Sequence, residues 1–380
     1  MYLWSYDIST NSGYGVNSMM EDLYSGKVVS HGPGDYSKTK TTFKNKFLET
    51  WQTSVKLQLE SNSDFFLNKK NGSFLRIGLL LATTKGHLED YIWLSKESLQ
   101  FKEPHQIKEP GADLMDEFLN HSWPKELPNP LLSTAISQAC SSTHIAFQVA
   151  KYWLDENCVD GVIILAGDIG GRFVTQGFAS LKIMTNTIQK PFDKNRDGLF
   201  LGDAIGMALV SNNKPPRDRA VKIKAVSNFT EGAVTRPSLS GECLFKSLEA
   251  LKVGTKQPVP DFIVAHGTGT RFNDIAEDRA LAKYFQSNGG NLQTPITGAK
   301  WCLGHTLGAS GLVDIIAAAE VIRQQKLFYL ANSKESDPEF LMKNYLYKTY
   351  EGKQKLNQAI VTSLGFGGVH AAAWLEGVKL

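Results

Sequence analysis

The sequence predicts an α/β protein made of two packed halves, and three observations lead to this prediction. Short apolar runs bounded by Gly, Asp or Asn recur along the chain, and segments with helical spacing lie between them. Strands that alternate with helices in this way are typical of α/β proteins. At 380 residues the chain is also longer than most single hydrophobic cores. Because no tandem sequence repeat is visible, any duplication between the halves has to be structural.

These short apolar runs are expected to form buried strands. They cover residues 76–84, 162–168, 204–211, 222–229, 262–266 and 361–366. Helical spacing follows Cys140, where Ile145, Val149 and Trp153 recur on one face. A second helical pattern begins after Gly311.

Two polar stretches interrupt this alternation. Residues from about 30 to 72 are lysine-rich, and residues 332–356 are also charged, so both are expected to be surface excursions rather than core. The segment 212–219, NNKPPRDR, is expected either to link the two halves or to form a loop between adjacent strands.

Composition and charge favour an ordinary globular protein. Hydrophobic residues make up 42% and charged residues 21%, and the net charge of +3 is too small to suggest a nucleic-acid binder. The four cysteines are widely spaced, which argues against a disulfide framework or a zinc site and favours a reducing compartment. Without a signal-peptide pattern or a long apolar segment, we expect a cytoplasmic protein with no membrane insertion.

Cys140 is the first candidate for a chemical role. It lies in STAISQACSSTHIAFQVAKYWL, directly before the helical pattern, so its thiol is expected at a helix N-terminus. Backbone N–H groups and the helix dipole at such a position stabilise a thiolate and can bind an oxyanion. Taken alone, this is weak support, because a free cysteine is more often a small buried core residue.

His266 is the second candidate, at the end of a strand in FIVAHGTGTRFNDIAEDRAL. The following Gly267 allows the backbone to approach a ligand closely, and the hydroxyls of Thr268 and Thr270 could bind an amide-rich ligand. An ordinary helix-capping turn explains this fragment equally well.

A third segment, GAKWCLGHTLGASG, places Lys300 five positions before His305 in a glycine-rich turn. A fourth, VTSLGFGGVHAAAWLE, predicts two strands joined at residues 365–368, where Phe366 could gate a pocket and offer its N–H to an oxyanion. Each segment alone also fits a purely structural role: His305 could be a core histidine, and residues 365–368 could be a hairpin turn with a core phenylalanine.

Together, these four segments resemble the β-ketoacyl synthase family, and they occur in the family's order over nearly the whole chain. The matching motifs are ACSSTHIAF with Cys140, HGTGT with His266, the lysine-to-GH segment with His305, and GFGG with Phe366. The segments 173–185 and 191–206 also match, as do Asp274 and Glu277 after the HGTGT turn.

The resemblance implies a thiolase-like, five-layered αβαβα fold made of two pseudo-duplicated halves. The N-terminal half, residues 1–220, would carry Cys140. The C-terminal half, residues 221–380, would carry His266, His305 and Phe366. The active site would lie between the halves.

The same resemblance implies an acyltransferase, a 3-oxoacyl-[acyl-carrier-protein] synthase. Cys140 would take up the acyl group, with its own N–H and that of Phe366 binding the oxyanion. A malonyl thioester would then lose carbon dioxide, and the side chains of His266 and His305 would stabilise the enolate that attacks the acyl-cysteine.

Supporting roles also follow from the resemblance. Lys300, Glu277 and Asp274 would order the catalytic groups. The residues expected at the substrate are Thr268, Thr270, Gly365 and Gly367, with the two threonines on the phosphopantetheine arm. No metal and no redox cofactor is expected.

The expected partners are acyl carrier protein and a second ketosynthase-like subunit, in a homodimer or a heterodimer. Because carrier proteins are acidic, a basic rim is expected at the mouth of the site. Lys69 and Lys70 are guesses for this rim.

Two departures from the family pattern stand out. Val369 and His370 follow the GFGG segment where Thr-Asn is common, and Asp203 stands where Glu is usual.

Fatty-acid elongation and the synthesis of a polyene or polyketide chain both fit the motifs. The alternatives are a coenzyme A-dependent thiolase-type enzyme, a catalytic subunit paired with a non-catalytic chain-length partner, and that non-catalytic partner itself. The presence of Cys140 with both histidines argues against the last.

Overall fold

The fold is described from a computed structural model of the chain. The residues described are 1–29, 42–62, 65, 75–90, 109–216, 219–232, 236–254 and 257–379. The guessed rim residues Lys69 and Lys70 lie outside them. No helix in the described ranges combines the length and the apolar character needed to cross a membrane.

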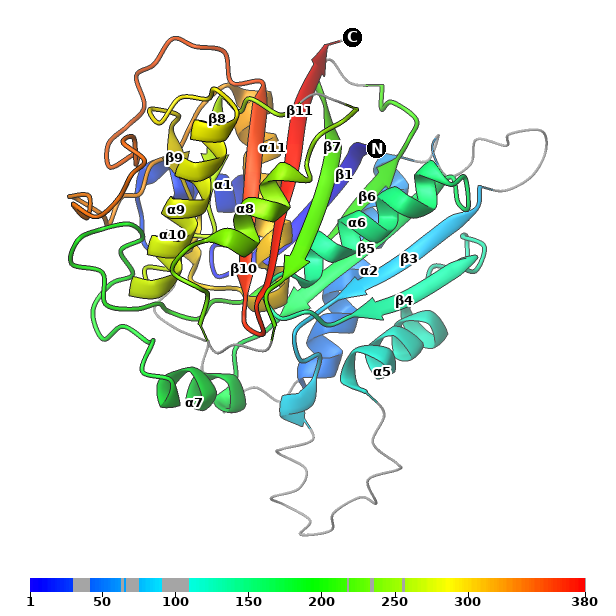
Figure 1. The fold of residues 1–380 in the computed structure, drawn as a ribbon. Helices are drawn as coiled ribbons and strands as arrows, with labels where there is room; N and C mark the ends of the chain where they lie inside the picture. The colour runs from blue at the N-terminus through cyan, green and yellow to red at the C-terminus, as the bar shows by residue number, and fades with distance from the viewer. Residues whose placement is uncertain are drawn as a thin grey trace.

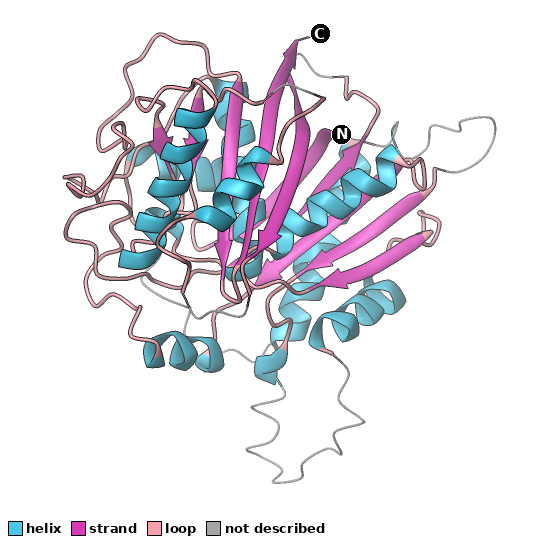
Figure 2. Cartoon of the chain, in the orientation of Figure 1, coloured by secondary structure: helices cyan, strands magenta, loops and turns pink. Residues whose placement is uncertain are grey.

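The α/β prediction is confirmed, because helices and strands alternate along the chain (Figures 1 and 2). The strands are β1 (Tyr2–Thr10), β2 (Gly13–Tyr14), β3 (Ile77–Ala82), β4 (Leu132–Ile136), β5 (Gly161–Asp168), β6 (Ala204–Ser211), β7 (Arg219–Thr230), β8 (Phe262–Val264), β9 (Ile296–Thr297), β10 (Gln358–Gly365) and β11 (Val369–Lys379). The helices are α1 (Val16–Ser25), α2 (Phe43–Ser61), α5 (Pro110–Glu117), α6 (Ser142–Asp155), α7 (Arg172–Ser180), α8 (Glu242–Glu249), α9 (Arg271–Ser287), α10 (Lys300–Leu303) and α11 (Ser310–Gln324), with a π-helical turn η3 (Phe118–Ser122) and a 3₁₀ turn η4 (Leu307–Ala309). All six predicted strands are present.

The described strands are hydrogen-bonded in the order β4-β3-β5-β6-β1-β7-β11-β10-β8-β9, with β2 beside β1. The junction between β1 and β7 is narrow, since only Tyr2 and Leu3 pair with Lys222 and Val221. Strands that precede residue 212 lie on one side of this junction, and strands that follow residue 218 lie on the other. A domain boundary near residue 220 stays a prediction.

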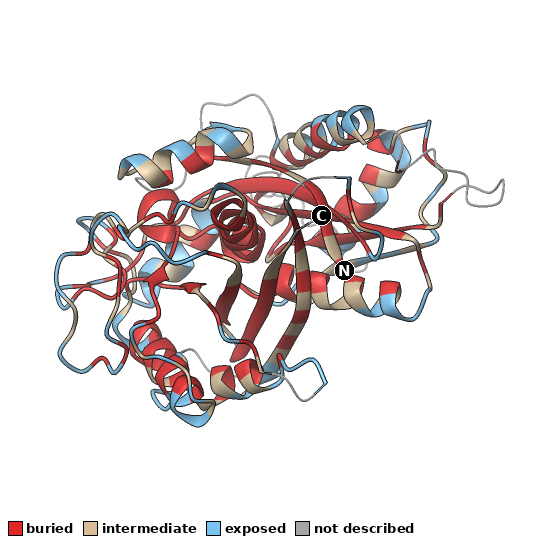
Figure 3. Cartoon of the chain, turned by 90° about the horizontal axis from the view of Figure 1, so that it is seen from above, coloured by how far each residue is buried: buried red, intermediate tan, exposed pale blue. Residues whose placement is uncertain are grey.

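Helices form three further layers around these two groups of strands. Helices α2 and α5 pack against β1, β3, β4 and β6 on one outer face, whereas α8 packs on β7 and β11 with α9 beside it on the other. Helices α6 and α11 lie between the two groups and contact strands of both. Every residue of α11 from Ser310 to Ile322 is buried, and Figure 3 shows the exposed residues mainly on the outer helices and loops.

The uninterrupted apolar strands follow from this layering. Alternate side chains of a strand point to opposite faces. In β3, Ile77, Leu79 and Leu81 face the core beneath α2 and α5, while Leu80 and Ala82 face the central core. Both faces of the strand are therefore apolar, which is why the run shows no polar alternation.

The prediction that residues 30–72 form a surface excursion is wrong for α2. Phe43, Phe47, Trp51 and Val55 recur every four residues among polar neighbours, and all four are buried. The lysine-rich composition therefore concealed an amphipathic helix. Residues 332–356 contain no helix or strand, yet Phe340 and other side chains there are buried, so that stretch is also part of the core.

Candidate active site

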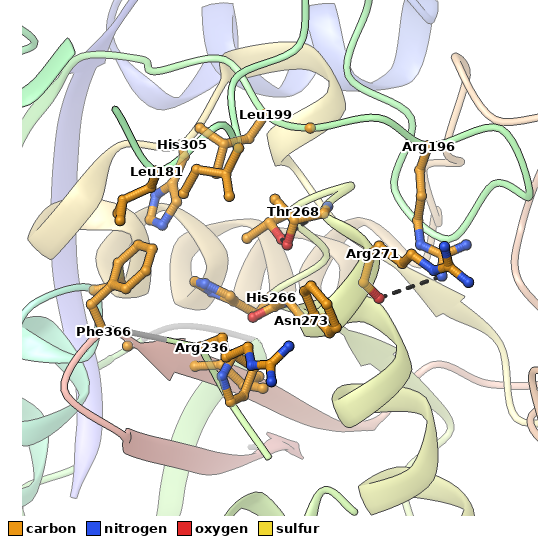
Figure 4. A pocket seen from close by; sticks show the side chains of 18 of the residues that line it. Leu181, Arg196, Leu199, Arg236, His266, Thr268, Arg271, Asn273, His305 and Phe366 are labelled. Carbon is orange, nitrogen blue, oxygen red and sulfur yellow. Dashed lines mark hydrogen bonds between the residues drawn. The ribbon is translucent and has the colours of Figure 1, made fainter. Parts of the chain in front are cut away.

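Four loops, three after strands and one after a helix, bring the predicted site residues together. Cys140 follows β4, His266 follows β8, His305 follows α10, and Phe366 follows β10. All four line one cavity, shown in Figure 4. Strands β8 and β10 are parallel neighbours, so their carboxyl ends place His266 and Phe366 at the same edge of the sheet.

Cys140 lies two residues before the start of α6, as predicted, and is buried. The preceding Ala139 has a φ of 48°, a left-handed backbone that turns the chain sharply into the helix. The backbone N–H groups of Cys140 and Phe366 lie near the sulfur, where they favour its ionised form. These donors and the charge of Lys300 favour a thiolate, but burial outweighs them and raises the pKa of Cys140 to about 12. The resting thiol therefore keeps its proton at neutral pH.

The side chains of His266 and His305 lie beside this thiol. The Cys140 sulfur and one ring nitrogen of each histidine are all within 4.8 Å of one another. The two imidazole rings are nearly perpendicular, with centroids 5.1 Å apart. Cysteine with two histidines is also a donor set that can hold a zinc ion, so the same three residues could bind a metal.

Both imidazoles are neutral at neutral pH. Burial, reinforced by the positive charge of Lys300, lowers the pKa of His266 and of His305 well below its usual range. The backbone N–H of Leu307 donates to Nδ1 of His305 at 3.0 Å, so the ring proton lies on Nε2. Neither ring nitrogen of His266 has a hydrogen-bond partner among the described residues. Both rings can therefore donate to a ligand.

Lys300 lies behind the cavity and pairs with Asp314, which the sequence analysis missed. Lys300 Nζ is 2.8 Å from Asp314 Oδ2, and both side chains are almost fully buried. Burial raises the pKa of Asp314, while the Lys300 charge opposes this shift. The signal that could have identified Asp314 is a single acidic residue within the first two turns of an otherwise apolar helix.

Glu277 and Asp274 hold the turn that follows β8. Glu277 accepts hydrogen bonds from the backbone N–H of His266 at 2.8 Å and of Gly267 at 2.9 Å. Asp274 accepts from the N–H of Gly269 at 3.1 Å. Burial raises the pKa of Glu277 to about 7 and that of Asp274 to about 6. Both carboxyl groups therefore position backbone and do not line the cavity.

Glycine is required within this turn. Gly267 has a φ of 43°, and a Cβ atom there would lie 2.9 Å from Cε2 of Phe192. The turn presents Thr268 and Thr270 to the cavity, where their hydroxyl oxygens are 2.9 Å apart.

The predicted hairpin at residues 365–368 is confirmed, since β10 and β11 pair in register up to Gly365 and Val369. We call residues 365–368 the gate loop. Ser363 Oγ donates to the carbonyl of Cys140 at 3.1 Å, and Ser141 Oγ donates to that of Val369 at 2.9 Å. The ends of the gate loop are thereby tied to the turn that carries Cys140. Gly365 lines the cavity, whereas Gly367 does not.

Phe178 is a second residue that the sequence analysis did not single out. It projects from α7, and its ring is T-shaped to Phe366, with centroids 5.3 Å apart, and to His305, with centroids 6.4 Å apart. The signal was present in the matching segment 173–185, whose aromatic residue had no assigned role.

The two departures from the family pattern have structural partners. His370 Nε2 lies 3.0 Å from Glu231 Oε1. Asp203 accepts a hydrogen bond from the backbone N–H of Gly170 at 2.6 Å and donates its own N–H to Asn11.

The mouth of the cavity is basic. Lys182, Arg236 and Arg271 line the cavity and are exposed. The Arg236 guanidinium lies over the ring of Phe272, 4.6 Å from its centroid. Arg196 is buried and forms an ion pair with Asp337 at 2.6 Å. Its guanidinium also donates a hydrogen bond to the carbonyl of Arg271 at 3.4 Å (Figure 4).

Comparisons with known proteins agree with this geometry. Residues 132–215 match the profile of the β-ketoacyl synthase N-terminal domain, and residues 223–334 match that of the C-terminal domain. A chloroplastic 3-oxoacyl-[acyl-carrier-protein] synthase I of Arabidopsis thaliana is 27% identical over 263 residues, which are 64% of this chain and 54% of the relative.

Solved structures share the fold at lower identity. A β-ketoacyl synthase from Burkholderia phymatum has a TM-score of 0.79 at 17% identity, covering 100% of this chain and 99% of its own. The ketosynthase ApeO of Xenorhabdus doucetiae, solved in complex with its chain length factor ApeC, has a TM-score of 0.76 at 20% identity, covering 99% and 98%. The predicted thiolase-like fold is confirmed. With both domain profiles matched in the expected order, the chain belongs to the β-ketoacyl synthase family of acyltransferases.

Proposed function

We propose that this chain condenses an acyl thioester with a malonyl thioester, with Cys140 as the nucleophile and acyl carrier protein as the carrier. The observation that supports this most directly is the cluster of one buried thiol and two neutral imidazoles within 4.8 Å. It combines a nucleophile, two hydrogen-bond donors and an available base in a single cavity.

In the first half-reaction the Cys140 sulfur attacks the carbonyl carbon of the acyl thioester. Since burial keeps the thiol protonated, a base has to accept its proton, and a neutral imidazole is within reach. The N–H groups of Cys140 and Phe366, which lie near the sulfur, would stabilise the oxyanion. The bond from the acyl carbon to the carrier sulfur then breaks, and the carrier leaves with the proton as a free thiol.

In the second half-reaction a malonyl thioester loses carbon dioxide, and its carbonyl oxygen gains negative charge as the enolate forms. The Nε2–H of His305 and a ring N–H of His266 would donate to this oxygen. The enolate carbon attacks the acyl-cysteine carbonyl, the bond from the acyl carbon to the Cys140 sulfur breaks, and the released thiolate takes up a proton from solvent water. The product is a 3-oxoacyl thioester.

Positioning residues support both steps. Burial, reinforced by the positive charge of Lys300, keeps both rings neutral and able to donate, and Asp314 holds Lys300 in place. Glu277 and Asp274 hold the backbone on which His266 stands. The hydroxyls of Thr268 and Thr270 face the route by which a phosphopantetheine arm would enter. This chemistry requires no metal and no redox cofactor.

The carrier protein would dock at the basic mouth. Lys182, Arg236 and Arg271 surround the opening, and opposite charge steers an acidic partner toward such a rim.

A second ketosynthase-like subunit would pair along β4. Among the described strands, β4 is a sheet edge that pairs only with β3, and Leu131 beside it is 59% exposed. This edge leads to Cys140, so a partner seated there would reach the acyl-binding end of the site. A copy of this chain or a chain length factor, such as the partner of the X. doucetiae ketosynthase, would fit this role.

The proposal is tested with purified protein, malonyl-carrier protein and an acyl-carrier protein. Mass spectrometry follows the 3-oxoacyl product and the acyl adduct on Cys140, and carbon dioxide release is measured in parallel. We expect the 3-oxoacyl product and the acyl adduct in the native protein and in Cys158→Ala, and neither of them in Cys140→Ala. The absence of product and adduct across several starters, with a partner subunit supplied, would overturn the proposal in favour of a coenzyme A-dependent or non-catalytic role.

A further inference from the structure

The gate loop is anchored at its base by a pair of residues outside the catalytic cluster. His370 is the second residue of β11, directly after the loop, and only 2% of it is exposed. Its Nε2 lies 3.0 Å from Oε1 of Glu231, a residue that follows β7. Since a carboxylate only accepts hydrogen bonds, the ring proton lies on Nε2, and Nδ1 has no partner among the described residues.

Glu231 holds the gate loop in two ways. Its backbone N–H donates to the carbonyl of Gly368, the last residue of the loop, at 3.0 Å. Its Oε1 accepts from His370, two residues further on. A hydrogen bond to an ionised acceptor that is mostly shielded from water is stronger than one between neutral groups.

The same carboxylate oxygen reaches the wall of the mouth. The backbone N–H of Ser238 donates to Glu231 Oε1 at 3.0 Å. The two residues before Ser238, Arg236 and Pro237, line the cavity together with Phe366 and His370. One oxygen atom therefore joins the base of the gate loop to the segment that carries a basic residue of the mouth.

The loop has a hydrogen bond of its own, from the N–H of Gly368 to the carbonyl of Gly365 at 3.2 Å, but its glycines leave it flexible. Gly367 and Gly368 have φ values of 82° and 76°, and glycine is free to leave such conformations. Phe366 carries the only side chain in the loop, and its backbone N–H must stay beside Cys140 to act as an oxyanion donor in the proposed reaction. The position of that N–H therefore depends on how firmly the start of β11 is held.

We infer that His370 and Glu231 form a latch, which fixes the gate loop to the Arg236 segment and so positions the Phe366 N–H against Cys140. The latch rests on the proposed function, because it assigns His370 and Glu231 as positioning residues for that reaction. It also explains how this chain closes its gate loop with His370 where Thr-Asn is usual.

The test compares three variants of the full chain. His370→Phe keeps a ring of similar size but removes the donor, and His370→Gln keeps a donor at a similar reach. Glu231→Leu removes the acceptor. Lys224→Gln is the matched control, because Lys224 pairs with Glu376 at 3.1 Å across the same two strands, far from the loop.

The first readout is the rate at which iodoacetamide alkylates Cys140, measured by peptide mass spectrometry at one fixed pH. Cys158, which is partly exposed and remote from the loop, serves as the internal reference. We expect the ratio of the Cys140 rate to the Cys158 rate to fall by up to about tenfold in His370→Phe and Glu231→Leu, because displacing the Phe366 N–H removes a donor that favours the Cys140 thiolate. His370→Gln and Lys224→Gln are expected to keep the native ratio.

The second readout separates positioning from simple packing. In the condensation assay, His370→Phe is expected to lower kcat with little change in KM for the acyl carrier, because the displaced Phe366 N–H would bind the substrate oxygen only in the transition state. The double variant of His370→Phe with Glu231→Leu is expected to be no worse than Glu231→Leu alone, since Glu231→Leu already removes the contact with His370.

Either of two results would overturn the latch: an unchanged alkylation ratio in both disrupting variants, or a His370→Gln variant that behaves like His370→Phe. If His370→Phe does not fold, Glu231→Leu alone tests the latch, because the Glu231 side chain is partly exposed and its replacement should leave the protein folded. Alkylation does not require condensation, so a native protein that makes no product would refute the proposed function while the alkylation ratio still tests the latch.

Discussion

Replacing Asp314 by Asn should destabilise the protein severely. Lys300 Nζ and Asp314 Oδ2 are 2.8 Å apart, with side chains 2% and 1% exposed. Asn has nearly the same shape as Asp, but it leaves the Lys300 charge buried without a counter-charge. Breaking a buried ion pair on one side costs about 3–5 kcal/mol.

This loss converts to a measurable shift in melting temperature. The entropy of unfolding is about 2.1 cal/mol/K per residue near 60 °C, or roughly 0.8 kcal/mol/K for 380 residues. Dividing the two values predicts a fall in Tm of about 4–6 °C, which differential scanning calorimetry at pH 7 can resolve.

The control is an ion pair of the same type on the surface. Lys283 pairs with Glu242, and the two side chains are 46% and 44% exposed. Such pairs contribute about 0–1 kcal/mol, so Glu242→Gln should lower Tm by about 1 °C or less. Replacing both buried partners, as Lys300→Met with Asp314→Leu, should recover most of the Tm lost in Asp314→Asn. An Asp314→Asn variant that melts no lower than the surface control would refute the reasoning.

Three further predictions concern the site. Gly267→Ala should lower the free energy of unfolding by about 1–3 kcal/mol, because the left-handed backbone and the contact with Phe192 both oppose a Cβ atom. The control is Gly177→Ala, where a Cβ atom meets nothing within 4 Å, and equal melting temperatures for the two variants would contradict the expectation. Since burial raises the pKa of Glu277 from 4.5 to about 7, the native state binds more protons than the unfolded state between these values. The free energy of unfolding should therefore fall as pH rises from about 4.5 to about 7. Urea unfolding measured across this pH range should show a smaller fall in Glu277→Gln, and the same fall as in the native protein would contradict this prediction. With a pKa of about 12, Cys140 should alkylate faster with every increase in pH, and a plateau below about pH 9 would show that its thiolate forms more easily than burial allows.

Much of the site could be read from local motifs. Cys140 before a helical pattern, His266 at the end of an apolar run, and Phe366 between glycines were each recognisable, because strand ends and helix starts are marked by residues close in sequence. The parallel pairing of β8 with β10 then makes it natural for two of these ends to meet.

Other elements were misread because composition hid their periodicity. The lysines of α2 suggested a surface segment, yet Trp51 and its neighbours at four-residue spacing are buried beneath the sheet. Phe340 lies in a charged stretch without regular structure, and only its packing against Phe192 and Tyr345 makes it part of the core.

The order of the motifs, their chemistry and the alternation of strands and helices are properties of short segments, so the amino-acid sequence alone determines them. Three contacts depended on the tertiary structure: Asp314 beside Lys300, Phe178 against Phe366, and Glu231 on His370. The last two pairs are more than 130 residues apart in the chain, and they meet only because the central layer and the strand order bring their loops to one cavity. The acidity of the thiol was also a tertiary property, because burial by distant segments outweighs the local helix N-terminus that favours the thiolate.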